Sequence, residues 1–110
     1  MGAPLNTFKT YTANLTTSGS TVYTAPTGYT TVVLMAQISN IGASTITVTG
    51  THLRSGNPTA IISGAKVPVN DALNILSGKL VMQTGDSMFI TASANNSGQL
   101  LLSILETLNP

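Results

Sequence analysis

Charged side chains are scarce in this 110-residue sequence. They make up 6% of the residues, whereas an average globular protein has about 25%. The four cations, Lys9, Arg54, Lys66 and Lys79, lie singly along the chain, so they form no basic stripe of the kind that neutralises phosphate groups. We therefore expect no nucleic-acid partner. The polar surface must come from the 18 threonines, the 11 serines and the amides.

Cysteine and long apolar runs are also missing. Without cysteine the sequence offers neither a disulfide framework nor a thiol nucleophile. The longest dense apolar run, 32–38, is far shorter than the roughly 20 residues that cross a bilayer. The first residues, MGAPLNTFKT, do not have the basic region and apolar core of a secretion signal. We expect no membrane partner, and a fold that is stabilised by packing alone.

Residues with catalytic or metal-binding chemistry are few and dispersed. His52 is the only histidine, and the acids are Asp71, Asp86 and Glu106. Metal sites and catalytic triads need several such groups to converge, and the GxSxG motif is absent. We predict a non-enzymatic protein with no catalytic, cofactor-binding or metal-binding residue. His52 is expected to be a solvated loop residue, and Asp86 to accept hydrogen bonds from backbone N–H groups of its own turn.

Aromatic residues are rare, and tryptophan is absent. The five aromatics are Phe8, Tyr11, Tyr23, Tyr29 and Phe89. A sugar-binding site usually presents flat aromatic faces, and the tyrosines could supply them. They could equally lie at the edge of the core with a satisfied hydroxyl, which is the simpler interpretation. A glycan-binding module for host attachment therefore stays an alternative function.

Period-two alternation is the strongest pattern that is present. In the segment TITVT at 45–49, isoleucine and valine face one way and the threonines the other, as in a half-buried strand. The same period over 86–94 predicts four inward-facing residues, Met88, Ile90, Ala92 and Ala94. Phe89 then faces outward.

Turn signals separate these alternating segments at short intervals. Ala25-Pro26-Thr27-Gly28 is predicted to form a type I turn, with proline in its second position and glycine in its last. Further reversals are predicted at 41–44, 84–86 and 95–98. The segment 99–108 could also form a helical stripe, but the turn before it favours a strand. We predict strands near 20–25, 30–41, 45–51, 59–67, 72–76, 79–83, 87–94 and 99–107.

Short strands punctuated this often indicate an all-β fold. The prediction is an antiparallel β-sandwich, jelly-roll-like or Ig-like, with about eight short strands. Residues 1–15 are expected to form an extended N-terminal arm, and residues 16–110 a single β-sandwich domain.

Two predicted strands are apolar on both faces. In the first, one face holds Val32, Leu34, Ala36 and Ile38, and the other begins with Val33 and Met35. In the last strand, one face holds Leu100, Leu102 and Ile104, and the other holds Leu101 and Leu105. A sandwich strand has only one inner face, so the outer apolar residues need a cover. The cover is either the N-terminal arm or a neighbouring copy, and a homo-oligomer, for instance a trimer, is the simpler remedy.

Two long segments carry a resemblance to a known family. VYTAPTGYTTVVLMAQISNIGASTITVT and KVPVNDALNILSGKLVMQTGDSMFITASANNSGQLLLSILE together span most of 22–106. They resemble small virion structural proteins of tailed bacteriophages, particularly marine and cyanobacterial ones. The resemblance implies a β-sandwich that is made in the host cytoplasm, assembles on the virion surface and has no active site.

Within that family, a capsid decoration or cement protein on the outer surface of the head is the first expectation. Its partners would be other copies of itself and the major capsid protein or other virion proteins. A neck, tail or fibre-associated position is the alternative. The residues expected to make assembly contacts are Phe8, Tyr11, Phe89, Leu101 and Leu105, although the two leucines could equally belong to the core.

Overall fold

The computed structural model describes residues 6–110, which form nine β-strands and no helix. Every predicted strand is present within a few residues of its expected position. The strands are β1 (Asn6–Asn14), β2 (Ser20–Thr24), β3 (Tyr29–Asn40), β4 (Ile46–Arg54), β5 (Asn57–Val67), β6 (Ala72–Asn74), β7 (Leu80–Met82), β8 (Ser87–Ala92) and β9 (Gly98–Leu108). Strand β1 occupies most of the expected arm, whose residues 1–5 lie outside the described residues.

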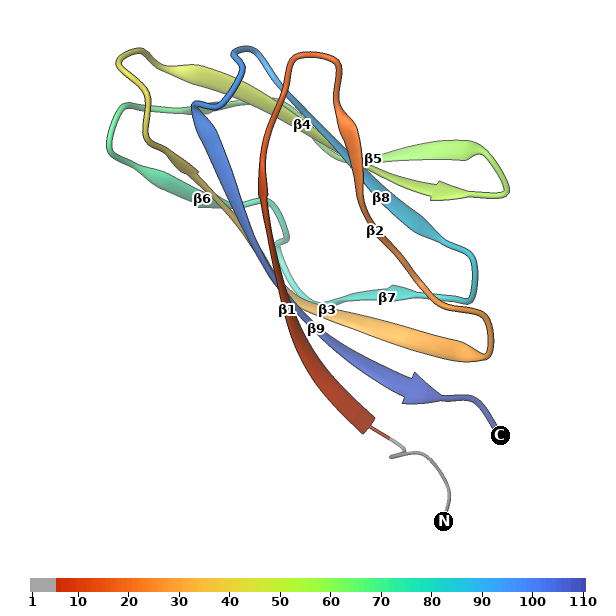
Figure 1. Cartoon of the computed structure of the whole chain (residues 1–110). Coiled ribbons are helices and arrows are strands. Elements are labelled where there is room, and N and C mark those ends of the chain that lie inside the picture. The colour runs from red at the N-terminus through yellow and green to blue at the C-terminus, as the bar shows by residue number, and fades with distance from the viewer. Residues whose placement is uncertain (1–5) are drawn as a thin grey trace.

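The strands form two antiparallel sheets that pack face to face (Figure 1). The five-stranded sheet has the order β1-β9-β3-β6, with β7 also paired to β3, and the four-stranded sheet has the order β2-β8-β4-β5. Among the nine described strands, only β4 and β5 form a hairpin between consecutive strands. Apart from that hairpin and the pair β6 and β7, each strand is followed by one in the opposite sheet. This is jelly-roll connectivity, which decides between the two sandwich types that the sequence left open.

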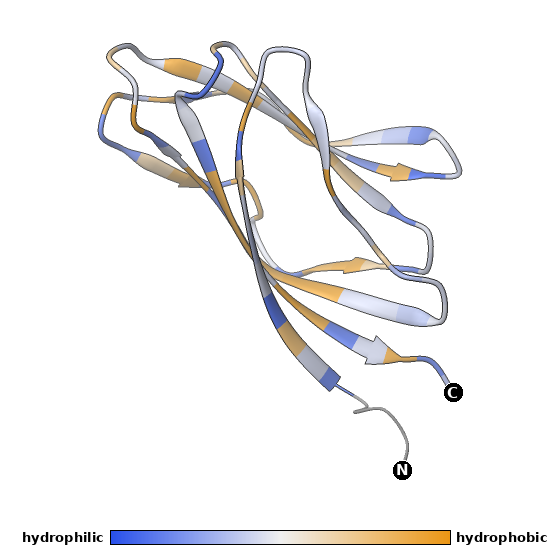
Figure 2. Cartoon of the chain, in the orientation of Figure 1, coloured by the Kyte–Doolittle hydropathy of each residue, from blue (hydrophilic) through white to orange (hydrophobic). Residues whose placement is uncertain are grey.

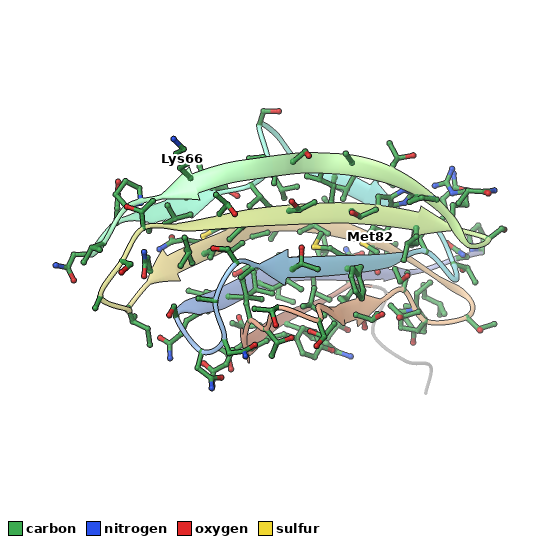
Figure 3. All side chains as sticks on the ribbon, turned by 90° about the horizontal axis from the view of Figure 1, so that it is seen from above. Lys66 and Met82 are labelled. Atoms are coloured by element: carbon green, nitrogen blue, oxygen red, sulfur yellow. The ribbon has the colours of Figure 1, made fainter. Side chains whose placement is uncertain are left out.

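The core lies between the sheets and is made of the inward residues of both. Met82 is fully buried there, whereas Lys66 projects outward from β5 (Figure 3). Hydrophobic and hydrophilic segments alternate along the strands (Figure 2). Ile46 and Val48 are buried as predicted, and so are Met88, Ile90 and Ala92. Ala94 is partly buried and packs against this core.

Strand β3 corrects one prediction, because a bulge interrupts its alternation. Its register against β9 shifts between Val33 and Met35. Val33, Ala36 and Ile38 are consequently all buried, while Val32 and Leu34 are only partly buried. The predicted face of Val32, Leu34, Ala36 and Ile38 is therefore wrong, since an extra residue in a bulge moves the later side chains to the other face.

The turn before β3 also differs from the prediction by one residue. The N–H of Tyr29 donates to the carbonyl oxygen of Pro26 at 3.1 Å, so the turn spans Pro26 to Tyr29. Gly28 is then its third residue, with φ of 84°. A positive φ at that position is typical of a type II turn, not of the predicted type I turn.

Within the described part of the chain, no helix is long and apolar enough to cross a membrane.

Candidate functional site

Asp86 is the centre of the first of two buried charge clusters. It lies just before β8 and is 2% exposed. Its carboxylate accepts hydrogen bonds from Arg54 Nη2 at 2.6 Å and from the backbone N–H of Gln83 at 2.9 Å. The Gln83 bond confirms the predicted turn role. His52 Nε2 lies 3.0 Å from the same carboxylate, so His52 is a partly buried residue of β4 and the prediction of a solvated loop residue is wrong.

The contacts around Asp86 set its charge state. The hydrogen bonds from Arg54 hold the pKa of the Asp86 carboxyl well below its usual range, although burial acts in the opposite direction. The carboxylate in turn raises the pKa of Arg54. Arg54 and Asp86 are 32 residues apart in sequence, and only the pairing of β4 with β8 brings them together. No sequence signal marked this ion pair.

Glu106 is the centre of the second cluster and is 4% exposed. The hydroxyl of Tyr23 donates to Glu106 Oε2 at 2.5 Å and lies 2.8 Å from Thr31 Oγ1. Lys9 Nζ lies 2.9 Å from Glu106 Oε1. Since Tyr23 belongs to β2 and Glu106 to β9, the cluster joins the two sheets. The interpretation of Tyr23 as a buried residue with a satisfied hydroxyl is confirmed.

Burial alone would raise the pKa of Glu106, but the hydrogen bonds from Tyr23 and Lys9 outweigh it and the net pKa is lowered. Burial and the bond to Glu106 raise the pKa of the Tyr23 hydroxyl above its usual range. Each buried acid thus stays ionised within an ion pair that connects strands. Among residues 6–110, no group of three or more histidine, cysteine or acidic side chains could hold a metal ion.

Three of the five expected contact residues lie on one surface, the outer face of the five-stranded sheet. Phe8 and Leu105 are directly paired across β1 and β9, and Leu101 lies on the same face further along β9. Phe8 is 73% exposed and Leu101 39% exposed, while Leu105 is partly covered. The described part of the chain therefore leaves an apolar surface open here.

The other two expected contact residues lie elsewhere. Tyr11 points to the inner side of β1, where its ring centroid is 5.6 Å from that of Tyr23. Phe89 faces outward as predicted, but on the four-stranded sheet. Gly19 of the β1–β2 loop lies so close that a Cβ atom there would be 2.5 Å from the Phe89 ring. The chain's own loop therefore covers part of Phe89.

The register extends the apolar surface into a row across four strands. Phe8 on β1 is opposite Leu105 on β9, which is opposite Val32 on β3, which is opposite Val81 on β7. We call these four residues the apolar row. Val81 is 54% exposed and was not among the expected contacts. Its place in the row follows only from the strand register, which the sequence does not state.

The outer face that carries the apolar row has no charged residue. The five strands of this sheet contain two charged side chains, Lys9 and Glu106, and these are paired with each other on the inner side. The opposite sheet differs, because the exposed Lys66 projects outward from β5 (Figure 3).

A shallow cleft of about 660 Å³ lies at one end of the same outer face. Hydroxyl and amide groups dominate its lining, which includes Thr12, Asn14, Gln37, Ser39 and Gln99. A smaller cleft of about 270 Å³ lies between the β4–β5 hairpin and the β6–β7 loop, and its lining includes His52 and Lys79. Neither cleft contains a cluster of acids or a nucleophile paired with a base.

No known family model matches this chain, and no curated protein sequence is significantly similar to it. Two antiparallel sheets with jelly-roll connectivity define the fold class of this chain. Its fold is similar to that of solved structures from viral particles and from a bacterial appendage.

Three of these structures illustrate the likeness. A chain from the capsid of Helicobacter pylori bacteriophage KHP30 has a TM-score of 0.59 and 9% identity, over 97% of this chain and 90% of that one. A chain of the T13 IBDV viral particle has a TM-score of 0.59 and 11% identity, over 96% of this chain but only 32% of that one. A chain of the disulfide-linked pili that form Bacillus endospore appendages has a TM-score of 0.56 and 13% identity, over 94% and 88%.

At these identities the likeness is one of fold. The present sequence has no cysteine, so it cannot form the disulfide links of the Bacillus pili. The chain spans about a third of the IBDV protein and nearly all of the other two.

Proposed function

We propose that this chain is a non-enzymatic virion structural protein of a tailed bacteriophage, and that it decorates or cements the outer surface of the capsid. It acts through contacts that recur between copies of itself and with the capsid lattice. Each contact is weak, and repetition makes the assembly stable because linked contacts form at high effective concentration.

The observation that carries this proposal is the uncharged outer face with its apolar row. Monomeric soluble proteins rarely expose contiguous apolar surface unless it is a contact site. Here Phe8 is 73% exposed at one end of the row and Val81 is 54% exposed at the other. The sequence resemblance to phage virion proteins and the fold likeness to viral capsid chains support the same function.

The use of the chain's titratable groups supports a non-enzymatic function. Asp86 and Glu106, the two buried acids, are each held by a cation and by further hydrogen bonds. His52, the only histidine, lies beside Asp86. A general base must reach a substrate proton, and these groups are committed to the packing of the fold.

The direct test is detection of the protein in virions. Antibodies raised against the purified chain should label purified particles of the phage that encodes it, in a regular pattern over the head when viewed by immunogold electron microscopy. Label on the neck, tail or fibres would move the protein to that position. Particles without the protein would show that the proposal is wrong.

The polar cleft favours a second candidate, a glycan-binding module for host attachment. Its hydroxyl and amide lining suits sugar hydroxyls, and lectin domains also use jelly rolls. Tyr23 cannot serve such a site, since its hydroxyl is buried against Glu106. Binding of the intact protein to host surface polysaccharide, lost in Gln37→Ala and kept in Lys66→Ala, would support this candidate. No binding to the host polysaccharide would eliminate it.

A further inference from the structure

Strand β1 is a regular edge strand whose outer side is open in the described part of the chain. All nine of its residues pair with β9 without a register shift, from Asn6 with Thr107 to Asn14 with Gln99. No described strand pairs with its other side. The strand contains no proline, and its one charged residue, Lys9, points to the inner side and binds Glu106.

The other edges carry the features that proteins use to prevent edge pairing. Strand β5 has two register shifts against β4 and has Pro58 near its start. Strand β2 has five residues and one shift, and β6 and β7 have three residues each. Among the described edges, β1 is thus both long and regular.

The hydrogen-bond pattern identifies which backbone groups of β1 point outward. The N–H of Leu15 donates to the carbonyl of Gly98 at 2.8 Å, continuing the register of β1 with β9. On the other side of β9, the N–H of Asn109 donates to Gly28 at 2.8 Å. Along a strand of an antiparallel pair, the backbone N–H and C=O groups of successive residues point alternately to its two sides. Both bonds therefore assign the same residues of β1 to the side that faces β9. The backbone N–H and C=O groups that point towards β9 are those of Thr7, Lys9, Tyr11 and Ala13. The backbone groups that point away from β9 are those of Asn6, Phe8, Thr10, Thr12 and Asn14.

We propose that a second copy of this chain pairs with this edge through its own β1, antiparallel and centred on Thr10. This inference rests on the proposed function, for which it names the self-contact. The register matches all nine residues of each strand and places Phe8 opposite the partner's Thr12. The two copies are then related by a two-fold axis that passes between their Thr10 residues. Two-fold symmetry is the usual symmetry of dimers of identical chains.

Charge selects this register over a neighbouring one. Shifting the pairing so that the axis passes through Lys9 would place two lysines opposite each other, which destabilises a strand pair. In the register centred on Thr10, Lys9 faces the partner's Tyr11 instead. The joined sheet continues across both copies, and the two apolar rows lie on one continuous face.

Thr10→Pro tests the edge without breaking the ladder to β9, because the N–H of Thr10 points away from β9. Proline is tolerated at such positions of edge strands. Thr10→Val is the matched control, since it keeps the N–H and the side-chain shape. At concentrations high enough for the weak contact to form, light scattering should give the wild-type and Thr10→Val proteins twice the chain mass of 11.3 kDa, and Thr10→Pro the single mass. Circular dichroism should show the same strand content in all three.

Hydrogen exchange provides a second readout. In the dimer, the amides of Phe8, Thr10 and Thr12 should exchange at least tenfold more slowly than after dilution to monomer. The amides of Lys9 and Tyr11 should stay protected in both states.

A Thr10→Pro protein with the same mass as wild type, or fast exchange at Thr10 in the assembled protein, would overturn the edge pairing. A wild-type chain that keeps the single mass at every concentration would overturn it too. Antibody labelling of virions decides the proposed function separately from these outcomes.

Discussion

At the scale of single residues, four of the seven charged side chains, those of Lys9, Arg54, Asp86 and Glu106, make internal connections. Asp86 links β4 to the turn before β8, and Glu106 links β1 and β9 to Tyr23 on the opposite sheet. Among residues 6–110, no buried polar side-chain atom lacks a hydrogen-bond partner. Because both acids are nearly inaccessible, removing a partner leaves a charge that water cannot reach.

Asp86→Asn should lower the free energy of unfolding by about 2 kcal/mol, since a buried amide keeps only part of the hydrogen bonds that the carboxylate accepts from Arg54 and from the N–H of Gln83. Asp71→Asn is the matched control, because Asp71 is exposed. It should change stability by less than about 0.5 kcal/mol. Urea unfolding measures both. Equal effects of the two substitutions would contradict the structural role of Asp86.

The two clusters also predict how stability depends on pH. The folded pKa values of Asp86 and Glu106 are lowered, so their contribution is complete above the ordinary carboxyl pKa of about 4. It is lost as the pH falls through the lower, folded values. Thermal unfolding from pH 7 to pH 2 should show a plateau down to about pH 5 and then a steady decline.

Tyr23→Phe should make this decline smaller, because Glu106 loses a donor that lowers its folded pKa and that value moves back towards the unfolded one. Tyr29→Phe is the control and should leave the profile unchanged. The raised pKa of Tyr23 adds a decline on the alkaline side, where stability is lost as the pH rises above the ordinary tyrosine value of about 10. A flat profile for the wild-type protein between pH 5 and pH 2 would contradict the role of the acids.

At the scale of strands and loops, the sequence predicted the positions of strands and turns, which depend on neighbouring residues. It did not predict the bulge and the long-range pairings, which depend on residues far apart in the chain. Alternation and turn signals located the strands, including the two short ones, β6 and β7. The bulge at Leu34 could not be predicted, because it depends on how β3 fits against β9. Pairings such as Arg54 with Asp86 and Val32 with Val81 require the topology, which alternation does not encode.

The β1–β2 loop gives a prediction at this scale. Gly19 has φ of 80°, and a Cβ atom there would lie 2.4 Å from Thr91 and 2.5 Å from the Phe89 ring. Gly19→Ala should destabilise the fold by about 2 kcal/mol, because a side chain both strains the backbone and displaces Phe89. Gly78→Ala, with nothing within 4 Å, should have an effect below about 0.5 kcal/mol. Thermal unfolding distinguishes them, and similar effects would contradict the close packing of this loop on Phe89.

At the scale of the whole molecule, the outer face of the five-stranded sheet combines exposed apolar residues with the absence of charge among its described strands. The sequence indicated this surface correctly in outline, since apolar residues fell on both sides of two strands. It could not show that Phe8, Leu105, Val32 and Val81 form one row, because these residues come from four strands. Of the five expected contact residues, three lie on this face, whereas Tyr11 lies on the inner side of β1 and Phe89 on the opposite sheet.

The central claim is that this chain acts by assembling with copies of itself. The most direct test is sedimentation velocity of the wild-type protein from about 1 to about 100 µM, a range that spans weak to moderate self-association. The account predicts a mass that rises with concentration above the 11.3 kDa of a single chain. A mass that stays at 11.3 kDa over the whole range would contradict it.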